Sequence, residues 1–234
     1  MSDLIRPLVI VHAECSDGFG AAWVFHKKFP DAEFHYAKHG SEPPNVYRLS
    51  GRDVYIIDFC YSRPQMEYIN WWAQSLTVLD HHKTAMDKCG DLSYCTFDMN
   101  RSGAMMAWDY CFPHLHAPTL ISYIQDRDLY QWRMKYSEEV CLFIASFEMN
   151  FSNWNMLETY LNNPRALQVA ISEGIAIKNF NKREVIHLLT RKHKLTIGGL
   201  EVTCVNTSSL RNEVCVEIWK TDKVAATYSF DGKQ

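Results

Sequence analysis

Three successive residues, Asp80, His81 and His82, carry side chains that bind metal ions and transfer protons. They follow the apolar run Leu76–Leu79, which predicts a short buried strand. We therefore expect the triplet at the carboxyl end of a strand, which is where open α/β sheets hold their ligands. Taken alone, the triplet is equally typical of a surface turn. Its interpretation depends on other residues of the chain.

A second polar group follows the apolar run Leu8–His12. His12 ends the run, and a short loop containing Glu14, Cys15 and Asp17 leads into a helix-like segment with two glycines at its start. Glycines allow the backbone to approach a ligand closely, and the amino terminus of a helix favours an anion. The alternative is an ordinary turn between strand and helix. This loop is a candidate ligand site of the same kind as the triplet.

Acidic residues close two further segments of the chain. Asp58 follows the apolar run 54–57, and Asp126 and Asp128 flank Arg127 after a helix-like stretch. A solvated turn held by its own ion pairs is the alternative for the second group. Arg101 precedes Ser102, a predicted helix cap, and is placed either to bind a phosphate or to lie in solvent.

Together these residues form a set of carboxylates and imidazoles at successive strand ends of one predicted sheet. Mixed oxygen and nitrogen ligands favour Mn, Mg, Fe or Zn, and a carboxylate such as Asp58 can bridge two ions. Two ions ~4 Å apart activate a water and stabilise the attacking and leaving oxygens of a phosphoryl displacement. Burying so many carboxylates together without cations is costly. The residue types therefore predict metal-assisted hydrolysis of a phosphoester or phosphoanhydride.

The elements that must position these side chains alternate between strand and helix in the first part of the chain. This alternation predicts an α/β fold with a parallel sheet and flanking helices at residues 1–132. Residues 133–197 read as a helical connector without strands. Residues 198–234 read as the beginning of a second α/β segment, about 35 residues long and incomplete.

Composition sets the remaining limits. The chain has 234 residues, of which 47% are hydrophobic, and this is ample for a packed core. No apolar run reaches the ~18 residues that a membrane span requires, and eight cysteines without a CxxC pair predict free thiols in a reducing compartment, so a cytoplasmic location is expected. A net charge of -3 lacks the basic excess of proteins that bind long duplex nucleic acid. Any nucleotide partner is expected to be short.

The order His12, Asp17-Gly18, Asp58, Asp80-His81-His82, Asp126 resembles the four motifs of the DHH phosphoesterase superfamily. That superfamily includes RecJ-like exonucleases, nano-RNA and pAp phosphatases, cyclic-dinucleotide phosphodiesterases and family II pyrophosphatases. The resemblance covers about residues 6–132. A weaker likeness to the opening of the DHHA1 substrate domain covers residues 202–234, where Asn206–Val214 is similar to it.

The resemblance implies roles for individual residues and a divalent-metal cofactor, with two Mn ions first and Mg, Zn or Fe as alternatives. His12 resembles a ligand of one metal, Asp17 a ligand of the other, and Asp58 the bridging carboxylate. His81 resembles a metal ligand, and His82 its neighbour at the scissile phosphate. The remaining roles are support of the triplet by Asp80 and a fourth-motif ligand at Asp126, with Asp128 as a neighbouring candidate or its replacement.

Two departures from the family pattern bear on function. The Asp expected two positions before Asp17 is Cys15, so Cys15 or Glu14 must substitute for it, and a thiolate favours Zn or Fe. The motif that closes a DHHA1 domain also has no counterpart in the chain. Substrate contacts are then left to Arg101, to a basic group at residues 182–194, or to a second subunit of a homodimer.

The leading functional hypothesis is a metal-dependent phosphohydrolase acting on a small nucleotide, such as a short oligonucleotide, a cyclic nucleotide or pAp. The alternative is a catalytically weak protein of the same fold that binds or sequesters a nucleotide.

Overall fold

The computed structural model describes residues 6–229, which divide between Ile171 and Ser172 into two compact units. Residues 1–5 and 230–234 of the predicted domains lie outside the described residues. The two units have separate cores and are described in turn.

The first unit is built on a five-stranded parallel sheet with the strand order β2-β1-β3-β4-β5. Its strands are short, and the inner strands β1 and β3 are rich in Val and Ile, which suits strands buried on both faces. Their bounds are β1 Leu8–His12, β2 Glu33–Ala37, β3 Asp53–Ile57, β4 Ser75–Asp80 and β5 Cys95–Phe97. The predicted parallel α/β fold is therefore confirmed, and β1, β3 and β4 lie within one residue of the apolar runs 8–12, 54–57 and 76–79.

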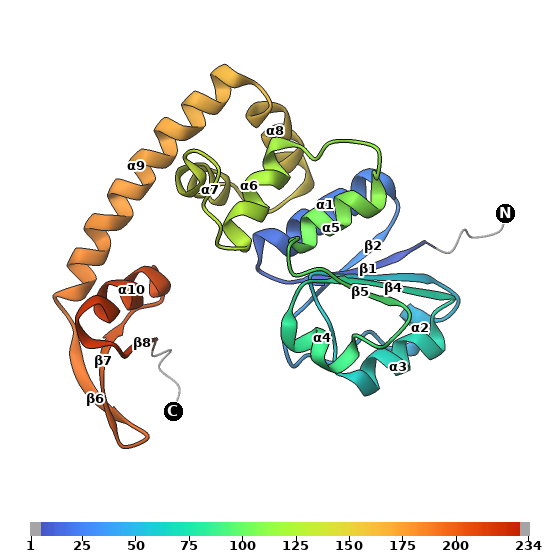
Figure 1. Ribbon diagram of the computed structural model, residues 1–234, viewed down its shortest axis with the longest axis horizontal. Coiled ribbons are helices and arrows are strands. Elements are labelled where there is room, and N and C mark those ends of the chain that lie inside the picture. Colours follow the sequence, from blue (N-terminus) through green and yellow to red (C-terminus); the bar gives the residue numbers. More distant parts are fainter. Residues whose placement is uncertain (1–5, 230–234) are drawn as a thin grey trace. The chain divides into compact units, whose positions relative to one another are not determined.

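Helices cover both faces of this sheet, so that the first unit has three layers (Figure 1). One face packs against α2 Val46–Leu49, α3 Arg63–Trp72 and α4 Lys83–Cys89. The other packs against α1 Ser16–Lys28 and α5 Gly103–Cys111, and α6 Thr119–Asp128, α7 Ser137–Ala145 and α8 Phe151–Leu161 extend this core through contacts among the helices. Successive side chains of a strand point to opposite faces of the sheet, so the neighbours Val9 and Ile10 of β1 pack in different cores.

The strand order places a topological switch point at the β1/β3 pair. The chain leaves β1 toward β2 on one side and returns to β3 on the other, since β1 pairs with both strands in parallel register. Loops that leave neighbouring strands in opposite directions open a crevice at their carboxyl ends, and ligands bind there in open α/β sheets. His12 ends β1 and Asp58 directly follows β3, so both lie at this point.

The predicted helical connector at residues 133–197 is divided between the two units. Helices α7 and α8 bury Ile144, Trp154 and Leu157 in the same core as α1, so they belong to the first unit, which extends to Ile171. The expectation of no strand before residue 198 is wrong, because β6 His193–Ile197 lies within the connector. Gly198 and Gly199 both have positive φ, which allows the two-residue turn that pairs Ile197 with Leu200.

The second unit contains a three-stranded sheet in the order β6-β7-β8. Strand β6 pairs antiparallel with β7 Leu200–Asn206, and β7 pairs parallel with β8 Ala225–Tyr228. Helix α10 Arg211–Asp222 connects β7 to β8 and packs Val214 and Ile218 on the sheet. The long helix α9 Pro164–Leu189 begins in the first unit and contributes Val185 to this core. In the described chain, every helix is too short or too polar to cross a membrane.

Candidate metal centre

Asp58 lies at the centre of the acidic group at the β1/β3 switch point. It follows β3 directly, has the positive φ of 56°, and exposes 2% of its surface. Its backbone N–H donates to the Leu79 carbonyl, which holds it to the end of β4. Asp58 Oδ2 has no hydrogen-bond partner among the described residues. A buried carboxylate oxygen without a donor, on a backbone in the left-handed region, is the strained and unsatisfied arrangement typical of a binding site.

Asp17 is fixed by the first turn of a neighbouring helix. Its two carboxylate oxygens accept hydrogen bonds from the Gly103 and Ala104 N–H groups, at 2.5 and 3.0 Å. These donors belong to the amino terminus of α5, where free N–H groups and the helix dipole favour a negative charge. Gly103 is required at this contact, because a Cβ there would overlap Asp58 Cβ and lie 3.0 Å from Asp17 Oδ2.

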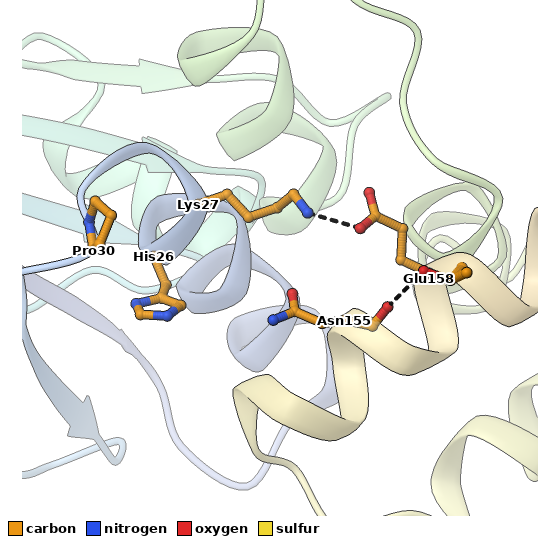
Figure 2. A pocket seen from close by; sticks show the side chains of 6 residues that line it. His26, Lys27, Pro30, Asn155 and Glu158 are labelled. Atoms are coloured by element: carbon orange, nitrogen blue, oxygen red, sulfur yellow. Dashed lines mark hydrogen bonds and ion pairs between the residues drawn. The ribbon is translucent and has the colours of Figure 1, made fainter.

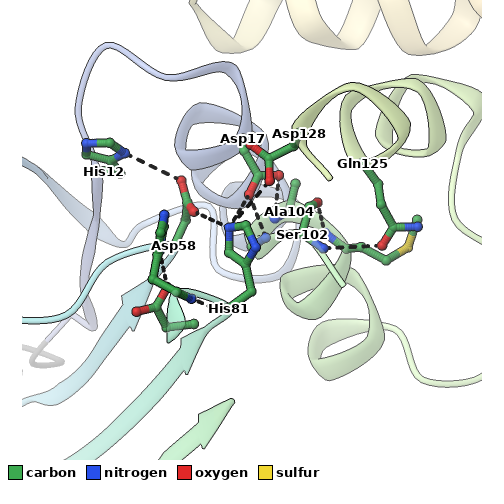
Figure 3. A network of polar contacts seen from close by, with 12 residues as sticks. His12, Asp17, Asp58, His81, Ser102, Ala104, Gln125 and Asp128 are labelled. Atoms are coloured by element: carbon green, nitrogen blue, oxygen red, sulfur yellow. Dashed lines mark hydrogen bonds and ion pairs between the residues drawn. The ribbon is translucent and has the colours of Figure 1, made fainter. Parts of the chain in front are cut away.

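His81 brings three carboxylates together on one ring nitrogen (Figure 3). Its Nε2 lies 3.2 Å from Asp58 Oδ1, 3.4 Å from Asp128 Oδ2 and 3.8 Å from Asp17 Oδ2. The four residues come from the ends of β4 and β3 and from α1 and α6, so only the folded chain assembles them. An imidazole nitrogen and several carboxylate oxygens directed at one point form a donor set suited to a hard or borderline divalent cation.

The electrostatics of this group show how crowded its negative charges are. Burial raises the pKa of Asp58 to about 8; the hydrogen bond with His81 opposes this increase, and the charges of Asp17 and Asp128 add to it. Burial and Asp17 also raise the pKa of Asp128 to about 6. Burial would lower the pKa of His81, but Asp58, Asp128 and Asp17 raise it to about 9. In the absence of a metal, the charged imidazole takes the position of a cation among the carboxylates.

Asp80 holds the histidine pair in place. Its Oδ1 accepts a hydrogen bond from the His81 N–H at 2.8 Å and lies 2.7 Å from His82 Nδ1. The hydrogen bond and charge of Asp80 raise the pKa of His82, although burial opposes them. The second oxygen, Asp80 Oδ2, has no hydrogen-bond partner among the described residues. With Nδ1 engaged, His82 has its Nε2 left for another contact.

His12 and Cys15 lie on the other side of Asp58. His12 Nδ1 is 3.8 Å from Asp58 Oδ2, and donor atoms of His12, Cys15 and Asp58 lie within 4.8 Å of one another. Burial raises the pKa of Cys15 to about 11, so its thiol is protonated when no metal is bound. Glu14, the other candidate for the missing carboxylate, is exposed and pairs with Lys38 at 2.5 Å. Of these two residues, Cys15 is the one beside the acidic group.

Three overlapping sets of donors therefore lie at this end of the sheet. Their members are His12, Cys15 and Asp58; Asp17, His81 and Asp128; and Asp58, Asp80, His81 and His82. Within each set the donor atoms lie within 4.8 Å of one another. Asp58 Oδ2 and Asp80 Oδ2 have no hydrogen-bond partner among the described residues, and burial together with neighbouring negative charge raises the pKa values of Asp58 and Asp128. The residues present fit a divalent cation.

The two acids at the end of α6 have different surroundings. Asp128 lies in the group around His81, with 24% of its side chain exposed. Asp126 is turned away from it and is buried, where its carboxylate accepts the Arg133 and Met134 N–H groups at 2.9 and 3.2 Å. Residues two positions apart on a helix point ~200° apart, so only one of them can face the sheet. The geometry favours Asp128 over Asp126 as the candidate ligand.

Arg101 is not brought to the acidic group by any contact of the described chain. It precedes Ser102, which caps α5 as predicted by accepting the Met105 N–H. Its guanidinium lies 3.4 Å from Asp109 at the surface. A phosphate contact of Arg101 therefore stays a prediction from sequence, without support from this arrangement. The basic residues expected at 182–194 belong to the second unit and to its helix α9 and strand β6.

His39 is a residue near the site that sequence reasoning missed. Its ring centroid lies 4.8 Å from that of His12 and 6.5 Å from that of His82. The charge of His39 contributes to the lowered pKa of His12, after the larger effect of burial. One signal was available in the sequence, because His39 comes two residues after the end of β2, the neighbour of β1.

A surface pocket of about 480 Å³ lies elsewhere, between α1 and α8 (Figure 2). It is lined by His26, Lys27, Pro30, Asn155, Glu158 and Thr159. Its carboxylate, Glu158, pairs with Lys27 at 2.7 Å. The pocket thus offers no unpaired group of acids among the residues that line it, and the strand ends remain the candidate centre.

Parts of this sequence and its architecture recur in other proteins. No protein-family model matches the chain. Uncharacterized protein R106 of Acanthamoeba polyphaga mimivirus is 29% identical over 171 residues, which cover 66% of this chain and 40% of that protein's length. An uncharacterized protein from Helicobacter pylori G27 superposes with a TM-score of 0.57 at 12% identity, over 95% of this chain and 83% of that one.

A second solved structure names the fold. It is the DHH domain of a member of a ribosomal protein family, and it superposes with a TM-score of 0.56 at 12% identity, over 96% of this chain and 72% of that one. The matched residues include parts of both units. The chain therefore has the fold of the DHH superfamily.

Proposed function

We propose that the chain is a metal-dependent phosphohydrolase that cleaves a phosphoester of a small nucleotide, such as a short oligonucleotide, a cyclic nucleotide or pAp. The observation that carries this proposal is the convergence of Asp58, Asp128 and Asp17 on His81 Nε2, beside the unpartnered Oδ2 of Asp58. A fixed, buried group of carboxylates and imidazoles at a sheet switch point serves a cation and an anionic ligand together.

Two sets of side chains would hold the metal. His12, Cys15 and Asp58 form one, and Asp17, His81 and Asp128 form the other, with Asp58 between them. Bound there, divalent cations, with Mn first and Mg, Zn or Fe as alternatives, would supply an activated water and neutralise charge on the phosphoryl oxygens. Asp58 is the shared carboxylate, because its two oxygens face different histidines, His81 and His12.

The remaining residues orient these groups. Helix α5 fixes both oxygens of Asp17 through two N–H groups, which holds the carboxylate without a large entropic loss on metal binding. Asp80 holds His82 through Nδ1, so that a protonated His82 can donate from Nε2 to a phosphate oxygen. Asp80 also fixes the backbone of His81. The triplet thus divides into support by Asp80, metal binding by His81 and phosphate contact by His82.

The substrate class is supported by charge. A net charge of -3 gives little long-range attraction to a polyanion such as duplex DNA, whereas a small nucleotide needs only local neutralisation.

Hydrolysis measured with purified protein tests this proposal. The substrates are pAp, a cyclic dinucleotide and RNA of two to five nucleotides, each with Mn, Mg, Zn or Fe(II). We expect turnover only with metal, and its loss in Asp58→Ala and His81→Ala. Asp91→Ala is the matched control, because this exposed carboxylate pairs with Arg63 away from the acidic group. Absence of turnover across the whole panel, or full activity of Asp58→Ala, would refute the proposal.

Cys15 supports a second candidate function, the sequestering of an intact nucleotide. A thiol whose pKa is raised to about 11 must lose its proton before it can bind a metal, which weakens one of the two sets. In that case the chain would bind a nucleotide tightly and release it unchanged after long incubation with metal. Chromatography of the recovered nucleotide distinguishes the two functions.

A further inference from the structure

The loop between α6 and α7 presents aromatic rings to solvent immediately after Asp128. Tyr130 is 76% exposed and Trp132 is 39% exposed, and their ring centroids lie 5.3 Å apart in an edge-to-face arrangement. Large aromatic side chains normally bury most of their surface, so two adjacent exposed rings call for a ligand. Tyr136, at the end of the same loop, is 40% exposed.

The loop is not a flexible tip, because a buried side chain holds it. The carboxylate of Asp126 accepts the Arg133 and Met134 N–H groups, and its carbonyl accepts the Gln131 and Trp132 N–H groups. Tyr130 and Trp132 have φ values of 53° and 52°, in the left-handed region that non-glycine residues adopt only with strain. The fold therefore uses a buried acid and two strained residues to present these rings.

The charges of the loop suit an anionic chain. Arg127, Arg133 and Lys135 alternate with the aromatic residues, and all three are exposed. Lys135 Nζ lies 5.1 Å from the ring centroid of Tyr136. Cations interleaved with exposed aromatic rings are the combination that binds single-stranded nucleic acid, since bases stack on the rings and the backbone follows the positive charge.

The position of the loop connects it to the candidate centre. Asp128 Oδ2 lies 3.4 Å from His81 Nε2, and Tyr130 is two residues farther along the chain, so the Cα atoms of Asp128 and Tyr130 are at most ~7.6 Å apart. The loop that carries the two rings therefore begins beside the residues proposed to bind the metal and the scissile phosphate. Among the other exposed aromatic residues, Tyr47 on α2 and Trp71 on α3 lie on helices that cover the opposite face of the sheet.

We propose that Tyr130 and Trp132 form a stacking platform for the bases of a single-stranded oligonucleotide, on a loop that Asp126 holds in shape. The inference rests on the proposed function and assigns the base of the small nucleotide to these two rings. Pyrophosphate and sugar phosphates are expected to be poor substrates, because they carry no base that could stack on the rings.

Binding of a labelled RNA pentamer tests the platform. The pentamer carries phosphorothioate linkages that resist hydrolysis, and its affinity is measured by fluorescence polarisation with Mn present. A pentamer of the same length and charge without bases is the comparison ligand. We expect the intact protein to bind the base-bearing strand roughly 5- to 150-fold more tightly for each stacked base. Tyr130→Ala and Trp132→Ala should each bind the base-bearing strand more weakly by that factor, and should bind the strand without bases as the unaltered protein does.

Matched variants separate stacking from folding. Tyr47→Ala and Trp71→Ala remove exposed rings of the same kinds from the opposite face and should leave both affinities unchanged. Tyr130→Phe and Trp132→Phe keep a ring and should retain most of the base preference. Equal binding of the two pentamers by the unaltered protein, weak binding of both, or full base preference in the two alanine variants would overturn the platform.

The same samples separate this inference from the proposed function. Turnover of an ordinary RNA pentamer is measured in parallel with Mn. Base-dependent binding without turnover would keep the platform and refute the hydrolase. Turnover without base dependence would keep the hydrolase and refute the platform.

Discussion

At the scale of single residues, the acids around His81 link protonation to stability. Asp58 and Asp128 have pKa values raised to about 8 and about 6, and that of His81 is raised to about 9. In the unfolded chain these groups titrate near ~4 for the acids and ~6.5 for histidine. The folded chain therefore binds these protons more tightly than the unfolded chain does. Each group stabilises the fold most at a pH below the pKa that it has in the unfolded chain, and this stabilisation is lost as the pH rises through its pKa in the folded chain.

From this we predict that the melting temperature of the metal-free protein falls as the pH rises from about 5 to about 9. The acids lose their protons through this range and repel one another, and His81 loses its charge toward the upper end of it. Asp58→Asn should flatten this dependence, because an amide cannot ionise. Thermal melts in EDTA at several pH values provide the measurement, and a melting temperature that rises steadily with pH would contradict the assignment.

Alanine variants of Asp126 and Asp128 should differ in which property they lose, stability or Mn affinity. Asp128→Ala removes a carboxylate from the group around His81, so we expect at least roughly a tenfold loss of Mn affinity with little loss of stability. Asp126→Ala leaves two part-buried N–H groups without their acceptor and removes the side chain that holds the loop, which costs about 1 kcal/mol or more. It should lower the melting temperature and leave Mn affinity within a few-fold. Calorimetric titration and thermal melts of both variants check this, and the opposite pattern would reassign the ligand.

At the scale of elements, the amino terminus of α5 is the part that brings Asp17 and Asp58 together. It donates two N–H groups to Asp17 and passes so close to Asp58 that only glycine fits at position 103. The helix thus sets the separation of two candidate ligands that are 41 residues apart in sequence, as their numbers 17 and 58 show.

We predict that Gly103→Ala reduces Mn affinity and turnover by at least roughly tenfold, because the added methyl group must displace Asp58 or the helix. Gly90→Ala is the control for general destabilisation, since its Cβ would meet the Met86 carbonyl at 2.6 Å, at the end of α4. Both variants should melt at lower temperature, but only Gly103→Ala should lose metal binding. Equal Mn affinity of Gly103→Ala and the unaltered protein would show that the close contact of α5 with Asp58 is not needed for metal binding.

At the scale of the whole molecule, the candidate metal centre lies within one of two units with separate cores. The sheet of residues 8–97 and its helices form one core on each face, whereas α9, β7, α10 and β8 contribute to another. A ligand that binds only the folded state stabilises the unit that holds it by ~2.7 kcal/mol at a concentration of about 100 times its Kd.

Mn should therefore slow amide hydrogen exchange in β1, β3 and β4 by roughly 100-fold where exchange requires unfolding of the first unit. Exchange in β6, β7 and β8 should change much less. Mass spectrometry of peptic fragments with Mn or with EDTA provides the measurement. Strong metal-dependent protection of the second unit alone would place the metal elsewhere.

The sequence by itself determined the fold class and most of the candidate ligands. Apolar runs at residues 8–12, 54–57 and 76–79 predict buried strands, and the polar residue at the end of each run must leave the core at the carboxyl edge of the sheet. His12, Asp58 and the triplet 80–82 follow from this local rule, because burial and strand period act over a few residues.

The tertiary structure decided what depends on helix rotation and on contacts between distant segments. Asp126 and Asp128 are equivalent in sequence, and the packing of α6 alone determines which of them faces His81. His39 and Gly103 gain their roles only when separate segments meet. The physical reason is that local pattern fixes which face of an element is buried, whereas the neighbours of a side chain across the core are fixed only by packing of the complete unit.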